Sequence, residues 1–427
     1  MSTNKKAFIG IDAGTTGCTV MIFDEKGNAL GHGYKEYPSE SPHAGWGEQS
    51  LEKVWDGICF ASRQATAKAN LPDEAYVSVG FSSQRGTLCL LDKDKKPLQD
   101  SILWYCTRAR DYPDIFSKDI SAEEYQDHTG MQLSPLWVAA KVAWLRDNKP
   151  ETFEKTAWFA NGQEYFLYLL GAERWETDPA SLTLNGMMDI RKLDWSDRVL
   201  EMCGIDRSRV PPVGPPSGMV GKVSKQAAEM TGIPEGVTLC RGAGDQQCAA
   251  IGAGVIKQGM AEFTVGTAGV MVAHLDSVDK IKGKNLWWGG HGVPNAWDIE
   301  GGAFCLGASL KWWRDNLGMD EVVEAEGRNT SPYAVMVDKA QQSPAGSRGL
   351  LFHSFLASQV TPYYDADSRG GLIGQGHVFG QDPVLQGHRL ALDHDVRGEL
   401  DPLLVLGQLQ DLELLPLPYI LSVLGIV

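Results

Sequence analysis

The stretch that decides the fold is AFIGIDAGTTGCTVMIF, residues 7–23. Its apolar residues 7–12 predict a buried strand, the small residues 13–17 a tight turn, and residues 19–23 a second strand. Turn chemistry follows, and a third strand is expected from Ala29. An antiparallel start of this kind is not the opening of a dinucleotide-binding βαβ unit.

The turn at residues 13–17 has the composition of a phosphate-binding loop. Gly14 permits close approach of a ligand to backbone N–H groups, and the hydroxyls of Thr15 and Thr16 add donors. Asp12 at the strand end is placed to organise Mg²⁺, directly or through water. The alternative is an ordinary hairpin in which Asp12 is a turn-forming side chain.

A second hairpin repeats this pattern about 255 residues later. Residues 261–274 have the order strand, Gly266-Thr267-Ala268-Gly269, strand. Two such hairpins predict two related lobes that each bring one Gly-Thr turn to a shared cleft. The competing interpretation is that Gly-Thr hairpins are common in unrelated proteins.

Other periodic segments predict an α/β protein. Helices are expected at residues 54–69, 136–148, 163–170 and 245–251, and further strands at residues 76–82, 86–91 and 238–241.

Composition narrows the class of partner. The chain has 427 residues and a net charge of −15, which argues against nucleic acid or an anionic membrane as the main partner. It has no apolar stretch of about 18 or more residues, and its 8 cysteines form no C-x-x-C pair. The expectation is a reduced, cytoplasmic enzyme acting on a small molecule.

Several motifs resemble, in order, those of the FGGY carbohydrate kinases of the actin/hexokinase-like superfamily, over about residues 6–374. They are Gly10-Ile-Asp-Ala-Gly-Thr-Thr16, Gly45-Trp-Gly-Glu-Gln49, Ser82-Ser-Gln-Arg85, Lys141-Val-Ala-Trp-Leu-Arg-Asp-Asn148, Arg241-Gly-Ala-Gly-Asp-Gln-Gln247, Val265-Gly-Thr-Ala-Gly269 and Arg369-Gly-Gly371.

The resemblance implies two ribonuclease-H-like lobes around a central cleft, with ATP and Mg²⁺ as cofactors. It makes Asp245 the catalytic base that accepts the proton of the substrate hydroxyl, a task that suits a carboxylate because proton loss comes late in a loose transition state. The alternative is that Asp245 is the N-cap of a helix, and the two roles are compatible.

The resemblance also assigns ligand contacts. Gln84, Arg85 and Gln246 are predicted to bind the sugar, and Gly266 and Thr267 to bind phosphate from the second lobe. For Arg85 the alternative is a surface or ion-pairing arginine, and for the Gly-Thr pair a plain turn.

Three departures from the family bear on the ligands. Thr19 stands where many members have Lys or Arg, so one cationic phosphate contact is missing. The glycerol-using branch has Glu at the position of Gly86 and Tyr at that of Leu136, and losing both removes hydrogen bonds that set specificity. Residues 245–247, Asp-Gln-Gln, nevertheless look glycerol-like. The substrate therefore stays open between a ketose such as a pentulose and a polyol longer than glycerol.

The last residues depart most. Residues 375–427 are rich in Leu, have no Lys, Asn or Thr, and lack the Gly-Gly-Gly adenosine loop of the family. The predicted domains are therefore 1–250, a partial second lobe at 251–374, and an atypical tail at 375–427. Three tail histidines, at 377, 388 and 394, form no metal motif.

The sequence thus leads to two hypotheses on function. The first is an ATP-dependent kinase of a sugar or polyol, and the second is a truncated, catalytically impaired homologue that retains sugar binding and binds ATP poorly. A chaperone or filament protein of the superfamily is disfavoured because Gln84, Arg85, Asp245 and Gln246 suit a small polar ligand. The oligomeric state is not fixed by the sequence, and a homodimer is one candidate.

Overall fold

The computed structural model describes residues 6–266, 268–280, 286–303, 305–356, 361 and 368–374. They fall into two compact units, each described by itself. Unit 1 lies within Met1–Glu262, Val272–Ile281 and Leu286–Glu300, and unit 2 within Phe263–Met271, Lys282–Asn285 and Gly301–Val427. Among the described residues, no helix has the length and apolarity needed to cross a membrane.

The main sheet of unit 1 has the strand order β11-β12-β5-β1-β2-β3. Its strands are β1 (Ala7–Ala13), β2 (Gly17–Asp24), β3 (Ala29–Glu36), β5 (Tyr76–Ser83), β11 (Met219–Lys222) and β12 (Thr238–Gly244). The central strands β12, β5 and β1 run parallel, whereas β2, β3 and β11 join antiparallel. The three strands expected from residues 7–36 are confirmed.

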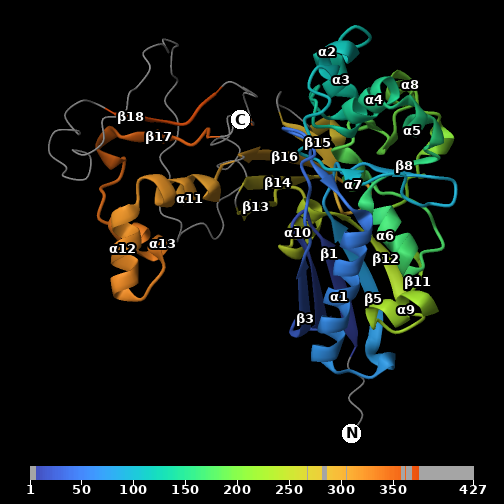
Figure 1. Ribbon diagram of the computed structural model, residues 1–427, viewed down its shortest axis with the longest axis horizontal. Coiled ribbons are helices and arrows are strands. Elements are labelled where there is room, and N and C mark those ends of the chain that lie inside the picture. The colour runs from blue at the N-terminus through green and yellow to red at the C-terminus, as the bar shows by residue number, and fades with distance from the viewer. Residues whose placement is uncertain are drawn as a thin grey trace. The chain divides into compact units, whose positions relative to one another are not determined.

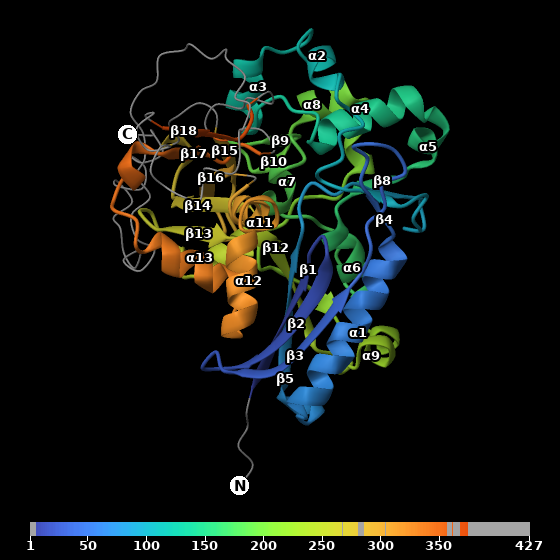
Figure 2. The same ribbon diagram turned by 60° about the vertical axis from the view of Figure 1, so that its left-hand side comes forward.

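Helices cover one face of this sheet. They are α1 (Leu51–Ala69), α6 (Gly162–Leu170) and α9 (Lys225–Thr231), and α1 runs along the strands beside α9 (Figures 1 and 2). The Ser50 hydroxyl caps α1 by accepting from the Lys53 N–H. At Gly33 an added Cβ would lie 1.9 Å from the Ala61 carbonyl oxygen, so glycine is needed for α1 to pack this close to β3.

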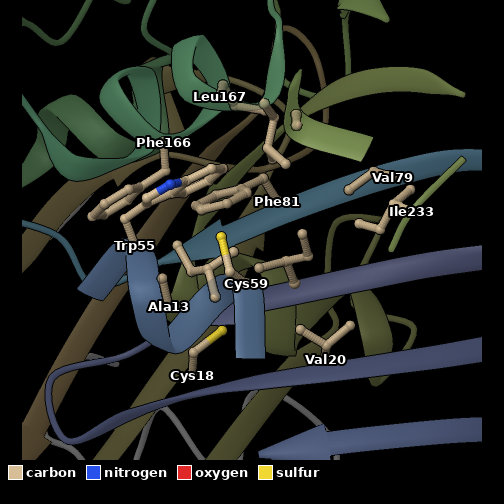
Figure 3. Packing of buried hydrophobic residues seen from close by; sticks show 14 of the residues in the cluster. Ala13, Cys18, Val20, Trp55, Cys59, Val79, Phe81, Phe166, Leu167 and Ile233 are labelled. Carbon is tan, nitrogen blue, oxygen red and sulfur yellow. The ribbon is translucent and has the colours of Figure 1, made fainter. Parts of the chain in front are cut away.

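The core lies between the sheet and these helices (Figure 3). Alternate residues of the central strands, such as Ile9, Ile11 and Val79, point into it and are almost fully buried. The rings of Phe81 on β5 and Phe166 on α6 stack with centroids 6.2 Å apart. The aromatic and aliphatic packing holds the central strands, and therefore their ends, in place.

Smaller elements complete unit 1. The strands are β4 (Glu48–Gln49), β6 (Cys89–Leu91), β7 (Ser101–Ile102), β8 (Trp158–Ala160), β9 (Met188–Asp189) and β10 (Asp194–Trp195). The helices are α2 (Tyr112–Phe116), α3 (Ala122–Thr129), α4 (Val138–Asn148), α5 (Pro150–Lys155), α7 (Pro179–Thr183), α8 (Asp197–Cys203) and α10 (Asp245–Gly252). Short 3₁₀ turns occupy Asp73–Ala75, Arg207–Arg209 and Val278–Lys280.

Two expected elements begin later than predicted. The strand predicted at 86–91 starts only at Cys89, because Gly86 has a left-handed φ of +67° and turns the chain. The helix predicted at 136–148 starts at Val138, with Trp137 as N-cap. Both are differences of boundary, the least predictable feature of an element.

A second sheet has the strand order β13-β14-β16-β15, with strands Ala261–Val265, Gly269–Leu275, Trp297–Ala303 and Trp287–Gly290 in that order. Unit 2 contains α11 (Gly307–Asn316), α12 (Met319–Arg328) and α13 (Pro332–Ala340), a 3₁₀ turn at Ser347–Gly349, and the antiparallel pair β17 (Leu351–His353) and β18 (Gly371–Ile373). Thr267 and the predicted tail, residues 375–427, lie outside the described residues, so the prediction of an incomplete second lobe does as well.

Candidate active site

Three parallel strands of unit 1 end side by side. Ala13 at the end of β1 and Gly244 at the end of β12 both pair with Ser83 at the end of β5. The residues that follow, Gly14, Gln84 and Asp245, therefore start from one edge of the sheet. In open α/β sheets the carboxyl ends of parallel strands are where ligands bind.

The end of β1 presents an exposed carboxylate. The Asp12 side chain accepts a hydrogen bond at Oδ1 from the Ser82 hydroxyl over 2.7 Å, and the two residues are register partners on β1 and β5. The Gly14 N–H donates to the Gly17 carbonyl over 3.0 Å, and the Gly14 carbonyl accepts from the Tyr37 hydroxyl over 2.8 Å. These bonds fix the turn and leave Asp12 facing solvent.

A ring of neutral hydrogen bonds holds Thr15. Its hydroxyl donates to Gln84 Oε1 over 2.8 Å and accepts from the Trp104 indole N–H over 3.1 Å. The Gln84 amide donates to Gln49 Oε1 over 2.9 Å, and the Gln49 amide donates to the Thr15 carbonyl over 2.8 Å. Gln84, predicted to contact sugar, thus has both polar ends engaged with the turn and its neighbours.

Asp245 is the first helical residue of α10. The N-cap alternative instead placed it just before the helix. The N-cap is Gly244, and Asp245 Oδ1 accepts from the N–H of Gln246 over 2.9 Å. The side chain is 38% exposed, and its Oδ1 lies 3.5 Å from Arg85 Nε. A partly exposed carboxylate with an adjacent cation suits a base that must be reached by a ligand.

Arg85 is neither a surface residue nor free. Its Nη1 and Nη2 donate to the two carboxylate oxygens of Glu300 on β16 over 2.9 and 2.7 Å, and both side chains are almost fully buried. Gln247 on α10 donates from Nε2 to Glu300 Oε2 over 3.3 Å and to Asp298 Oδ2 over 2.8 Å. A buried cluster of one cation and two carboxyls therefore adjoins Asp245.

This cluster shifts two pKa values upward. Withdrawal from water raises the pKa of Asp245, Arg85 opposes the shift, and the negative charges of Asp12 and Glu300 add to it. Burial, with Glu300 as the next largest cause, raises the pKa of Asp298 from its ordinary 3.8 to about 7. Asp298 therefore titrates near neutral pH, within the buried cluster around Arg85.

Lys141 on α4 supports the wall of the site. Its buried Nζ donates to the carbonyls of Gly86, Leu103 and Trp104 over 3.3, 2.8 and 3.0 Å. It thereby ties the residue after Arg85 to the residue that bonds Thr15. Burial lowers the pKa of Lys141 to about 7.

The structure brings most of the predicted site residues together in unit 1. Those that adjoin the three strand ends are Asp12, Gly14, Thr15, Thr16, Gln84, Arg85, Asp245 and Gln246. Gly266 belongs to unit 2, where its N–H donates to the Ala268 carbonyl over 2.9 Å and its carbonyl accepts from the Gly307 N–H at the start of α11 over 2.9 Å. Its predicted partner in phosphate binding, Thr267, is outside the described residues.

Sequence reasoning missed several contributors. Glu300 and Asp298 carried no usable signal, because acidic residues that alternate with Trp297 and Ile299 in a strand predict a solvated face, whereas the structure buries both. Gln247 and Gln49 stood inside quoted motifs without a role. For Trp104 the sequence offers no local pattern that marks its bond to Thr15.

Comparison with known proteins identifies the family. The N-terminal domain of the FGGY family of carbohydrate kinases matches residues 7–252, and the C-terminal domain of that family matches residues 261–386. The chain belongs to the FGGY family of carbohydrate kinases. The match extends past residue 374, where the motif resemblance ended.

Individual FGGY kinases are similar at low identity. A glycerol kinase of Thermococcus kodakarensis is 27% identical over 415 residues, covering 96% of this chain and 80% of that protein. A xylulose kinase of Bacillus subtilis is 28% identical over 375 residues, covering 86% of this chain and 72% of that protein, and a gluconokinase of the same organism is 27% identical over 368 residues, with 86% and 71% covered.

Solved structures confirm the fold class. A ligand-bound xylulose kinase from Lactobacillus acidophilus superposes with a TM-score of 0.78 at 24% identity, over 87% of this chain and 73% of that one. A glycerol kinase from Plasmodium falciparum with ADP gives a TM-score of 0.74 at 20% identity, over 87% and 73%. The solved structures thus confirm the α/β fold, and the family match confirms the enzyme class, a carbohydrate kinase.

Proposed function

We propose that this FGGY kinase transfers a phosphoryl group from ATP to a hydroxyl of an uncharged ketose, such as a pentulose, or of a polyol longer than glycerol. The observation that carries the proposal is the partly exposed carboxylate of Asp245, held 3.5 Å from Arg85 at the same sheet edge as the turn after β1.

Asp245 acts as the base in this proposal. Its Oδ1 is engaged by the Gln246 N–H and faces Arg85, so Oδ2 is the oxygen left to orient the substrate hydroxyl and accept its proton. Arg85 favours the ionised carboxylate that this step requires. Because the transition state of phosphoryl transfer is loose, the proton leaves late and a carboxylate is basic enough.

Arg85 and Gln246 are proposed as substrate contacts. A hydroxyl bound to Asp245 would lie within reach of Arg85 Nε, because the two groups are already 3.5 Å apart. The buried Oε1 of Gln246 has no hydrogen-bond partner among the described residues, which leaves it able to accept from a sugar hydroxyl. Gln84 supports Thr15 in addition to any contact with sugar.

The nucleotide is proposed to bind through the turn after β1, and phosphate binding by Gly266 and Thr267 stays a prediction of the sequence. Among the described residues, no cluster of three or more His, Cys, Asp or Glu side chains could hold a metal alone. The exposed Asp12 fits Mg²⁺ that arrives with nucleotide phosphates, because that ion needs only one or two protein carboxylates. When bound, Mg²⁺ would neutralise phosphate charge.

The preference for a substrate other than glycerol rests on the pocket wall. Gly86 offers no side chain, and an added Cβ there would lie 3.2 Å from Leu184, so this wall is backbone and apolar. Leu136 likewise lacks a hydroxyl.

A cytoplasmic location and a homodimer stay predictions of the sequence.

The competing proposal is a catalytically impaired homologue that retains sugar binding. It is favoured only by the composition of residues 375–427, which lack the glycine-rich adenosine loop. In that case sugars would bind, whereas MgATP would bind weakly and no product would form.

One panel separates these proposals. Thermal shifts and ADP release are measured with D-xylulose, a hexulose, erythritol, glycerol and gluconate, each with and without MgATP, and products are identified by mass spectrometry. The kinase proposal expects turnover that is fastest with a ketose or longer polyol. A preference for glycerol would contradict the substrate assignment. Sugar-induced shifts without any phosphorylated product would support the impaired homologue.

A further inference from the structure

The charge of Arg85 is already matched within the protein. Its two terminal nitrogens meet both oxygens of Glu300 in a fork-to-fork pair, and the side chains are 3% and 2% exposed. Such a pair is the strong form of a charge-assisted hydrogen bond. Glu300 is held in turn by Gln247, which also bonds Asp298, so the carboxylate cannot leave Arg85 without breaking a second buried contact.

The ion pair with Glu300 neutralises the charge of Arg85 but leaves some of its N–H donors unused. A guanidinium has five N–H groups, and the bonds to Glu300 account for two. Among the described residues the buried Nε–H has no hydrogen-bond partner, and Nε lies 3.5 Å from Asp245 Oδ1. The group can therefore still donate to a hydroxyl, while it offers no uncompensated positive charge.

We propose that Glu300 is a specificity-determining residue, which cancels the charge of Arg85 and so restricts the site to uncharged sugars and polyols and excludes sugar acids. This inference rests on the function proposed above, because it takes Asp245 as the place where the substrate hydroxyl binds.

The surrounding charges support this exclusion. The groups that act electrostatically on Asp245 besides Arg85 are Asp12 and Glu300, both carboxylates, and Asp298 acts on Arg85. A sugar carboxylate entering beside Asp245 would meet like charges and no free cation among these groups. A neutral hydroxyl would meet no such repulsion, because it needs only one donor and one acceptor.

The test compares binding of one neutral and one acidic ligand. Calorimetry without ATP gives the dissociation constants of gluconate and of the best neutral ligand from the panel, for wild type and Glu300→Gln. Glutamine has the same shape but no charge. Wild type should prefer the neutral ligand, and Glu300→Gln should narrow that preference about tenfold or more, the scale of a hydrogen bond to a charged group.

Two further variants guard against a merely structural effect. Arg85→Gln/Glu300→Gln removes both charges and should keep the wild-type exclusion of gluconate. Glu176→Gln breaks another pair with a buried arginine, Arg241, and should leave the preference unchanged.

In Glu300→Gln the acid limb of the pH profile of kcat/KM should also move to lower pH, because Glu300 raises the pKa of Asp245.

The outcomes are distinguishable from failure of the proposed function. Absence of phosphorylated product with wild type would sink the kinase proposal while leaving the binding ratio measurable. Wild type that shows no preference for the neutral ligand overturns the inference, as does a folded Glu300→Gln with an unchanged ratio. If Glu300→Gln does not fold, gain of gluconate binding by the double variant is the contradicting result.

Discussion

The two sides of the site, both at the same edge of the sheet in unit 1, are built on different principles. At the end of β1 the ring that joins Thr15, Gln84 and Trp104 is made of neutral hydrogen bonds, and the carboxylate of Asp12 is exposed. At the end of β12 the contacts are ionic and buried, with Arg85 between Glu300 and Asp245.

The two sides should respond differently to substitution. A neutral hydrogen bond contributes about 1 kcal/mol net, so losing one weakens the turn but does not break it. Removing one member of a buried ion pair leaves an uncompensated charge and costs about 3–5 kcal/mol. Substitutions at the β12 side should therefore lower the free energy of unfolding more than substitutions at the β1 side.

The largest effect on stability is expected for Arg85→Met. It leaves the buried carboxyls of Glu300 and Asp298 without their cation, and the free energy of unfolding should fall by about 3–5 kcal/mol. Urea denaturation measures this. The matched control is Arg198→Met, which breaks the exposed pair with Glu124 and should cost about 1 kcal/mol or less. Equal losses in the two variants would contradict the contrast between buried and exposed pairs.

The next effect is a pH dependence at Asp298. Its pKa is about 7 in the folded protein and 3.8 ordinarily, so between these values the unfolded chain ionises first and rising pH disfavours folding. Stability contributed by the protonated carboxyl is thus complete below pH 3.8 and lost by about pH 7.

Asp298→Asn removes this titration. Relative to wild type, the variant should gain stability steadily across that window, and the difference should level off above about pH 7. Denaturant unfolding at a series of pH values measures the slope. A stability difference that does not vary with pH would show that Asp298 is ionised in the folded protein throughout.

The smallest effect is expected on the neutral side. Thr15→Val removes a hydroxyl that donates to Gln84 and accepts from Trp104, and stability should fall by about 1–2 kcal/mol for the two bonds. Affinity for MgATP should fall and that for sugar should not. Thr15→Ser keeps the hydroxyl and should behave like wild type. Loss of sugar affinity in the valine variant would place Thr15 on the substrate side instead.

Local sequence predicted the backbone of the site well. The pattern of residues 7–23 gave β1, its turn and β2, because alternation and small turn residues are local properties. The helix start predicted at Asp245 is confirmed, and only the N-cap differs from the alternative, because it is Gly244 and not Asp245. The strand ends at which the motifs lie can therefore be predicted from local sequence.

The partners of the site's side chains could not be predicted from the sequence, because they come from distant segments. Glu300 lies 215 residues from Arg85 in the chain, and Trp104 lies 89 residues from Thr15. A pattern read along the sequence can mark Arg85 as functional but cannot say whether its charge is free or paired. In the proposal above, that distinction decides whether the site accepts a sugar acid or excludes it.

Single-turnover kinetics of Asp245→Asn, with the best sugar of the panel and MgATP, test whether Asp245 is the base of this carbohydrate kinase. Asparagine keeps the shape and the bond from the Gln246 N–H, so sugar binding should survive. Phosphoryl transfer should slow by about 10²-fold or more, the contribution of a general base. Asp197→Asn, an exposed carboxylate on α8, serves as control. Transfer by Asp245→Asn at close to the wild-type rate would contradict the account.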